Sequence, residues 1–151
     1  MSSVSGDGPK VTNVKGYASP RPFSGFQVPI PMQSMFIRRY CEERGFTFNH
    51  HVVENITPDS YLVLERLVTE ATQYQALAMC SIGMLPIRSQ SRDTMLHRCI
   101  SDGLSVHFIF EQLIVSTRDD IARLNELIKL TRLLDDPRSQ IQGLIDLMDH
   151  E

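Results

Sequence analysis

The segment from Gly16 to Gln33 contains residue types that can hold a phosphate or a carboxylate. Ser19 and Arg21 stand just before the expected start of a helix, and Tyr17 and Ser24 supply two further hydroxyls. A helix N-terminus presents free N–H groups and a partial positive charge, and an arginine adds two parallel donors. The segment therefore predicts half of an anion-binding site. The alternative is a rigid, proline-rich surface turn with incidental polar residues.

Two further pairs of side chains could complete such a site. Arg88 and Arg92 are four residues apart, so on a helix they would share one face and offer a second contact to the anion. His107 and Glu111 would move protons, as a histidine beside a carboxylate does in general acid–base catalysis. The alternatives are a solvated helix face for the two arginines and a hydrogen-bonded core residue for His107.

The predicted site thus has two classes of residues. The predicted catalytic residues are Ser19, His107 and Glu111. The predicted ligand-binding residues are Tyr17, Arg21, Ser24, Ser81, Arg88 and Arg92. The sequence contains neither a glycine-rich nucleotide-binding fingerprint nor a metal-ligand spacing of Cys and His, so we expect no metal and no organic cofactor.

Hydrophobic periodicity divides the chain into alternating strands and helices. Strands are predicted at residues 11–18, 46–54, 76–82 and 104–110, and residues 113–115 are a candidate for a short fifth strand. Helices are predicted at residues 32–45, 57–71, 91–103 and 117–135, with a short final helix beyond Pro137. Thr57 would cap the second helix, and Pro58 would be its first residue.

This alternation predicts an α/β fold, in which a four-stranded, mainly parallel sheet is flanked by helices. Such sheets bind ligands beyond the carboxyl ends of their strands. The predicted site residues follow or end the first, third and fourth strands, and Glu54 and Asn55 follow the second. We therefore expect these side chains to converge at one edge of the sheet.

Length, composition and net charge limit the classes of protein to which this chain can belong. With 151 residues, of which 42% are hydrophobic and 22% charged, the chain is expected to form one ordinary globular domain. A net charge of -3 argues against a specific nucleic-acid partner. No stretch fits a signal peptide or a membrane span, so we expect a cytoplasmic protein. The three widely spaced cysteines predict buried free thiols.

Three segments are expected along the chain. Residues 1–10 are predicted to be a disordered tail, residues 11–116 the α/β domain, and residues 117–151 a helical segment for oligomerisation. Apolar residues of the helix at 117–135 spread over more than half of its circumference, which is wider than the single stripe that covers a sheet. We therefore predict a homodimer or a higher homo-oligomer. The alternative is that the final helix folds back and covers this surface within one chain.

Four stretches resemble the sporadic carbohydrate cluster proteins, which are encoded in bacteria among genes for surface polysaccharides. They are GYASPRPFSGFQVP, IRRYC, LPIRS and VHFIFEQLIV, and the resemblance runs from about Gly16 to Glu126. The family's name describes gene neighbourhood, so the resemblance implies a pathway and not a reaction.

A weaker resemblance, in layout, is to the catalytic domains of serine recombinases (resolvases). Those begin with a strand ending in Tyr-Ala, then a polar loop with the nucleophilic serine and an arginine, then a glutamine that opens the first helix. Tyr17, Ala18, Ser19, Arg21 and Gln33 are similar. However, the arginine here follows the serine, SIGMLPIR replaces the family's Asp-Arg pair, and the basic DNA-binding module is missing. This resemblance implies a resolvase-like fold without strand exchange.

Two functions from different classes are therefore expected. The first is a protein of bacterial surface-carbohydrate biosynthesis that binds, or acts on, a phosphorylated or nucleotide-activated sugar. Its partner would be this small anionic sugar, with no specific nucleic acid and no membrane. The alternative is a non-catalytic regulatory or scaffold oligomer with a resolvase-like fold. Whether the chain is an enzyme is left open at this point.

Overall fold

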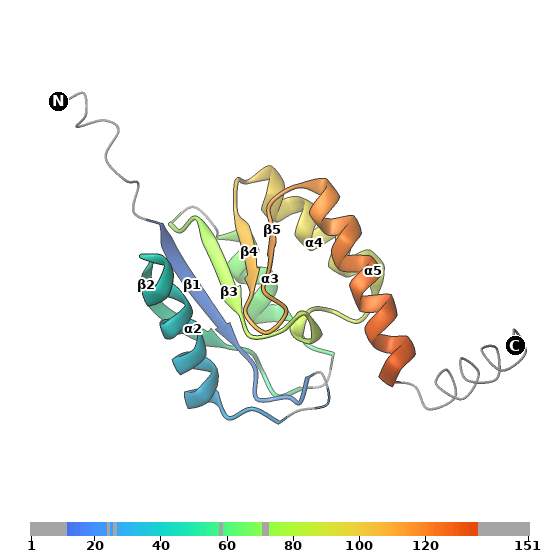
Figure 1. The fold of residues 1–151 in the computed structure, drawn as a ribbon, viewed down its shortest axis with the longest axis horizontal. Coiled ribbons are helices and arrows are strands. Elements are labelled where there is room, and N and C mark those ends of the chain that lie inside the picture. The colour runs from blue at the N-terminus through green and yellow to red at the C-terminus, as the bar shows by residue number, and fades with distance from the viewer. Residues whose placement is uncertain (1–11, 24, 26, 58, 71–72, 136–151) are drawn as a thin grey trace, which may run out of the picture.

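The computed structural model describes residues 12–135, except residues 24, 26, 58, 71 and 72. Strands and helices alternate along the chain (Figure 1). The elements are β1 (Asn13–Ala18), α2 (Ile30–Arg44), β2 (Thr47–Val53), α3 (Leu62–Thr69), β3 (Ala76–Met79), the 3-10 turn η1 (Ile82–Met84), α4 (Ser89–Ser101), β4 (Ser105–Phe108), β5 (Leu113–Val115) and α5 (Arg118–Asp135). The predicted tail, Ser24, Pro58 and the predicted final helix lie outside the described residues.

The five strands form one mainly parallel sheet in the order β2-β1-β3-β4-β5. β1 pairs in parallel with β2 and β3, and β3 pairs in parallel with β4. β5 pairs antiparallel with β4, because the chain returns through a tight turn in which Gln112 has a φ of 54°. The predicted α/β fold is therefore confirmed, and the candidate fifth strand is present.

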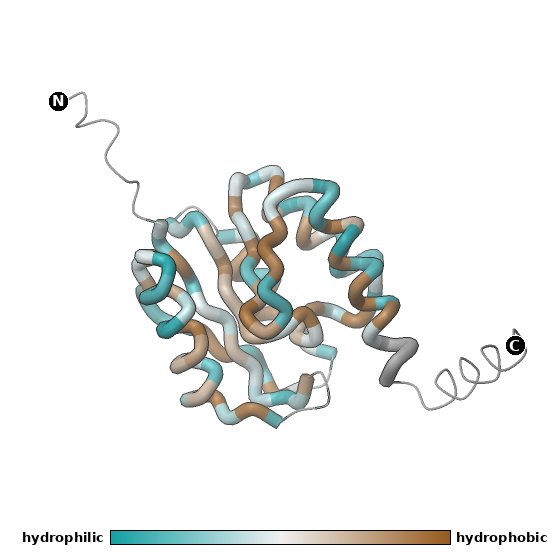
Figure 2. The backbone as a smooth tube through the Cα atoms, viewed as in Figure 1, coloured by the Kyte–Doolittle hydropathy of each residue, from teal (hydrophilic) through white to brown (hydrophobic). Residues whose placement is uncertain are grey.

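Helices cover the two faces of the sheet unequally (Figure 1). α2 lies on one face, where Ile37, Tyr40 and Cys41 pack on Val14 and Ala78. α3 and α4 lie on the other face, above the larger apolar cluster. Apolar residues are concentrated along the strands in the middle of the molecule (Figure 2).

α5 runs beside β5, and its last turns extend beyond the sheet (Figure 1). Its residues Ile121, Leu124 and Ile128 are buried in the larger apolar cluster. At its start, the Thr117 hydroxyl accepts the backbone N–H of Asp120, and the Asp120 carboxylate accepts the N–H groups of Ser116 and Thr117. This reciprocal cap explains where the helix begins. The boundary predicted at residue 117, and the role in oligomerisation, stay predictions.

Glycines stand where the backbone demands them. Gly45 ends α2 with a φ of 70°, and its N–H bonds to carbonyls of the last helical turn. At Gly16 a Cβ atom would come within 3.0 Å of side-chain carbons of His51 and Phe48. Gly16 therefore permits the close approach of β1 and β2.

Most element boundaries differ from the prediction by one or more residues, and two of these differences involve residues of the candidate site. α3 begins at Leu62, so Thr57 does not cap it; the N–H groups at its start bond instead to the carboxylate of Glu54. β3 ends at Met79, because Ser81 caps the turn η1 through its own hydroxyl.

The three cysteines are buried and free, as predicted. Burial raises the pKa of Cys41 to about 11 and those of Cys80 and Cys99 to about 12. These thiols are therefore protonated at neutral pH. Within the described part of the chain, no helix is both long enough and apolar enough to cross a membrane.

Candidate functional site

The loop after β1 is clamped to the first turn of α2 by one buried side chain, Gln33. The backbone N–H of Ser19 donates to Gln33 Oε1 at 3.0 Å, and Gln33 Nε2 donates to the carbonyl of Ser19 at 2.7 Å. Gln33 Nε2 also donates to the carbonyl of Val28. Gln33 is fully buried, and these three bonds satisfy its amide. The pairing fixes Ser19 at the carboxyl edge of the sheet.

Ser19 and Arg21 line a small cleft of about 210 Å³ at this edge. The Ser19 hydroxyl accepts the backbone N–H of Arg21 at 3.2 Å, and Ser19 is 3% exposed. The Arg21 guanidinium donates to the carbonyl of Thr57 and lies 4.6 Å above the centre of the Tyr61 ring. Asp59 adds a carboxylate to the lining. The cleft therefore carries charges of both signs, and its arginine is already held by the protein.

The carboxylate of Glu54 occupies a position where an anion would bind. It accepts the N–H groups of Asn55, Val63 and Leu64, and so fills the N-terminus of α3. It also accepts the hydroxyl of Tyr17 at 2.9 Å. Burial, and then the negative charge of Glu54, raise the pKa of Tyr17, so this phenol stays a neutral donor. Tyr17 and Glu54 are both buried, and the protein supplies its own anion here.

Glu111 has a structural partner of its own. Its carboxylate accepts the hydroxyl of Ser81 at 2.8 Å and the N–H of Ile82 at 3.0 Å. The Ser81 hydroxyl in turn accepts the N–H of Gly83. Glu111 therefore ties the β4–β5 turn to the 3-10 turn after β3.

His107 lies on the opposite face of the sheet from Tyr17. Its Nδ1 is 2.5 Å from the hydroxyl of Tyr40 in α2, and its Nε2 is 2.9 Å from the hydroxyl of Ser105. The ring packs edge to face against Tyr40 and Phe46. Burial first, and the nearby Arg44 second, lower the pKa of His107 to about 4. His107 is therefore a neutral core residue at physiological pH, which was one of the two interpretations of the sequence.

Lowering the pH is expected to destabilise the fold through His107. Its pKa falls from 6.5 in the unfolded chain to about 4 in the folded one, so between these values the unfolded chain binds the extra proton. The contribution of neutral His107 to the free energy of unfolding is complete above pH 6.5. It is lost as the pH falls toward about 4, at up to about 1.4 kcal/mol per pH unit. Urea unfolding measured at several pH values across this window gives the dependence of the unfolding free energy on pH. The His107→Gln variant should lack the part of this dependence that His107 causes. If the unfolding free energies of wild type and His107→Gln fell equally with decreasing pH, His107 would not be the cause.

The two predicted arginines of the third helix have different environments. Arg88 is exposed and is the residue before α4. Arg92 is 4% exposed; its Nε and Nη2 donate to Asn125 Oδ1 in α5, and its Nη1 donates to the carbonyls of Pro86 and Ile87. Arg92 therefore joins α4 to α5.

The predicted site residues do not form one cluster. Ser19 and Arg21 share the cleft, Tyr17 is hydrogen-bonded to Glu54, and Ser81 is hydrogen-bonded to Glu111. His107 is on the other face, and Arg92 is directed to α5. The sequence interpretation missed the cleft residues Asp59 and Tyr61 and the partner Asn125; none belongs to a local pattern that could reveal it. Among the described residues, no cluster of His, Cys, Asp and Glu could hold a metal ion.

Comparison with known proteins identifies the fold. No protein-family model and no curated protein matches the sequence. The N-terminal catalytic domain of TP901-1 integrase superposes with a TM-score of 0.56 at 15% identity, covering 82% of this chain and 99% of that one. A resolvase family site-specific recombinase from Streptococcus pneumoniae superposes with a TM-score of 0.55 at 9% identity, covering 91% and 97%. The fold is therefore resolvase-like.

These neighbours correct the main functional expectation. The resemblance to sporadic carbohydrate cluster proteins has no support, and the expected role in surface-carbohydrate biosynthesis is wrong, since the similar structures are recombinases. The expected sugar-phosphate partner and the exclusion of nucleic acid are contradicted as well, because site-specific recombination is a reaction of DNA. The physical reason for the error is that an arginine and a serine after a strand indicate an anion of any kind, and a DNA backbone is one.

Proposed function

We propose that this chain is a non-catalytic regulatory or scaffold oligomer with a resolvase-like fold, which works in association with DNA in the cytoplasm. The fold of the two recombinase neighbours supports the DNA context. The observation that carries the non-catalytic role is the state of Ser19. Its hydroxyl accepts a backbone N–H, it is 3% exposed, and the predicted base and acid, His107 and Glu111, are bonded elsewhere.

The requirements of phosphoryl transfer also support a non-catalytic role. Attack on a phosphodiester develops negative charge that enzymes stabilise with several preorganised cationic groups or metal ions. Among the described residues that line the cleft, Arg21 is the single cation, and it donates to Thr57 and covers Tyr61. The Asp59 carboxylate on the same lining would repel a phosphate. This cleft is therefore poorly suited to hold a scissile phosphate.

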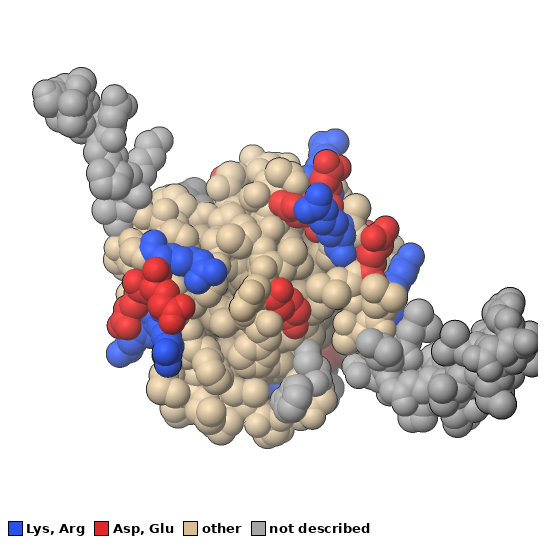
Figure 3. Space-filling model, in the orientation of Figure 1, with Lys and Arg blue, Asp and Glu red and all other residues tan. Residues whose placement is uncertain are grey.

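The outer side of α5 supports the oligomeric part of the proposal. Leu130 is 58% exposed and Leu127 is half-buried, whereas Ile121, Leu124 and Ile128 pack on the core. On the face seen in Figure 3, positive and negative side chains are mixed along α5 and over α2, and no continuous basic stripe is visible. An exposed leucine among mixed charges fits contact with another protein surface better than contact with a phosphate backbone.

Replacing Leu130 by glutamate is expected to shift the protein toward monomer without unfolding it. A leucine buried at an interface contributes about 1.5–3 kcal/mol, so the dissociation constant should rise at least about tenfold. Light scattering after size exclusion measures the shift. Leu62→Glu is the matched control, because Leu62 is 65% exposed at the start of α3. A wild-type chain that is monomeric at all accessible concentrations would refute the oligomer.

A second candidate function is serine-dependent cleavage of DNA. It is favoured by the placement of Ser19 and Arg21 in one cleft, with Gln33 clamping the loop. Incubation with supercoiled plasmid distinguishes the two functions. We expect wild type and Ser19→Ala to leave the plasmid equally intact. Nicking by the wild type that disappears in Ser19→Ala would overturn the non-catalytic role.

A further inference from the structure

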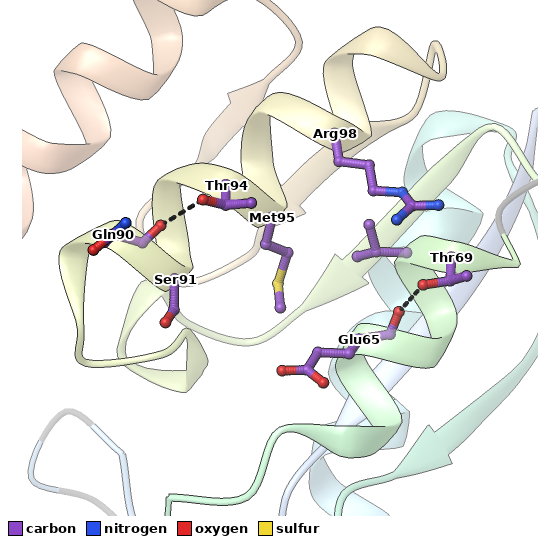
Figure 4. A pocket seen from close by; sticks show the side chains of 8 residues that line it. Glu65, Thr69, Gln90, Ser91, Thr94, Met95 and Arg98 are labelled. Atoms are coloured by element: carbon purple, nitrogen blue, oxygen red, sulfur yellow. Dashed lines mark hydrogen bonds between the residues drawn. The ribbon is translucent and has the colours of Figure 1, made fainter.

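A groove of about 480 Å³ lies between α3 and α4, apart from the cleft that contains Ser19 (Figure 4). Its volume is in the range of small-molecule sites. The lining residues come from the two helices and are Glu65, Val68, Thr69, Gln90, Ser91, Thr94, Met95 and Arg98. None of them is among the residues on which the sequence resemblance to resolvases rests.

The base of the groove is apolar, and part of its polar rim is already used. Val68 is 3% exposed and Met95 is 8% exposed. The hydroxyl of Thr69 donates to the carbonyl of Glu65 and that of Thr94 to the carbonyl of Gln90, each one helical turn back. A bound molecule would therefore contact an apolar floor, and its main polar partners would be the two charged side chains of the groove, Glu65 and Arg98.

Those two charges are opposite, and they stand on opposite walls. Glu65 extends from α3 toward the Met95 side, and Arg98 extends from α4 toward Thr69 (Figure 4). They do not pair with each other. Arg98 makes one long contact, 3.9 Å from its Nε to Asp102, and Glu65 has no ion pair within the described part of the chain. The groove thus presents a carboxylate and a guanidinium, separated by an apolar floor.

We propose that this groove binds a short peptide with free termini. The peptide ammonium would lie beside Glu65, its carboxylate beside Arg98, and an apolar side chain would cover Val68 and Met95. A simple anion would be repelled by Glu65 and a simple cation by Arg98, so the pair selects ligands with both charges. Because Glu65 and Arg98 stand on different helices and do not pair with each other, a peptide whose two terminal charges are separated suits the groove. This inference does not depend on the proposed oligomer.

The test is a titration of the full chain with the tripeptide Ala-Leu-Ala, followed by two-dimensional amide NMR. We expect saturable shifts at residues of the groove, such as Thr69 and Thr94, in the millimolar range. Acetylating the amine or amidating the carboxylate should each weaken binding about two- to fivefold, which is the range for one exposed ion pair. The absence of saturable shifts, shifts located at the Ser19 cleft, or equal binding of capped peptides would overturn the proposal.

Two variants assign each charge. Glu65→Gln should bind the free peptide more weakly and lose the distinction between free and acetylated amine. Arg98→Gln should lose the distinction between free and amidated carboxylate. Arg66→Gln is the matched control, because Arg66 is exposed on α3 but does not line the groove. The positions are exposed, so folding should persist, and the same spectra confirm it. If both variants still distinguished free from capped peptides, Glu65 would not contact the amine and Arg98 would not contact the carboxylate.

Discussion

Replacing Glu54 by alanine is expected to lower the free energy of unfolding by about 4 kcal/mol, which is a large fraction of the stability of a small domain. The carboxylate is 2% exposed and accepts four hydrogen bonds, from Tyr17 and from the N–H groups of Asn55, Val63 and Leu64. Its loss leaves the Tyr17 hydroxyl without this acceptor inside the core and removes the cap of α3. Urea unfolding followed by circular dichroism measures the difference.

Two further variants separate charge from shape at this position. Glu54→Gln keeps one acceptor oxygen but not the charge, so we expect about half of the loss seen with alanine. Glu42→Ala removes an exposed carboxylate from α2 and should change the stability by less than about 0.5 kcal/mol. If Glu54→Ala were as mild as Glu42→Ala, the carboxylate would not hold β1, β2 and α3 together.

Replacing Arg92 by alanine is expected to cost about 3 kcal/mol of stability. The guanidinium links Asn125 of α5 with the carbonyls of Pro86 and Ile87 before α4. Asn125 also donates to Asp93, so the amide is part of a network between the two helices. Without the guanidinium, the carbonyls of Pro86 and Ile87 lose a charged donor, and the contact of α5 with the domain weakens. Unfolding followed by circular dichroism measures the total loss.

The matched control for Arg92 is Arg88→Ala. Arg88 is exposed, so its removal should leave the unfolding free energy within about 0.5 kcal/mol of wild type. Arg92→Lys should lose an amount of unfolding free energy between those of Arg92→Ala and Arg88→Ala. The single ammonium group of lysine cannot reproduce the planar guanidinium, which bonds to the amide and to both carbonyls at once. Equal effects of Arg92→Ala and Arg88→Ala would show that the α4–α5 network contributes little to stability.

The alternation of strands and helices could be predicted because its causes are local. The run at Ala76–Met79 is continuously apolar and forms the strand β3, buried on both sides. Gly45 ends α2 in the left-handed region, as its type and position indicate. The start of α3 could not be predicted in this way. Thr57 and Pro58 form a good local start signal, but the acceptor that caps the helix is Glu54, at the end of the preceding strand.

In the candidate site, too, some features could be predicted from the sequence and others depended on residues distant in the chain. Sequence order correctly placed Ser19 and Arg21 together after β1, since two residues so close in the chain share one loop. It could not determine the face of β4 from which His107 projects. Both faces of this strand are lined by apolar neighbours, so alternation along VHFIF does not distinguish them. Val106 and Phe108 project into the larger apolar cluster, and His107 therefore projects to the side of α2 and Tyr40.

By itself, the sequence determined the α/β class, the mainly parallel sheet and the chain positions of its charged and polar groups. Those properties follow from periodicity, turn residues and caps that act over a few residues. Only the tertiary structure decided which polar groups meet: Glu54 with Tyr17, Glu111 with Ser81, and Arg92 with Asn125. Each of these pairs is about 30 or more positions apart in the chain. They form because a buried polar atom must find a partner wherever packing brings one, and no local pattern records that partner.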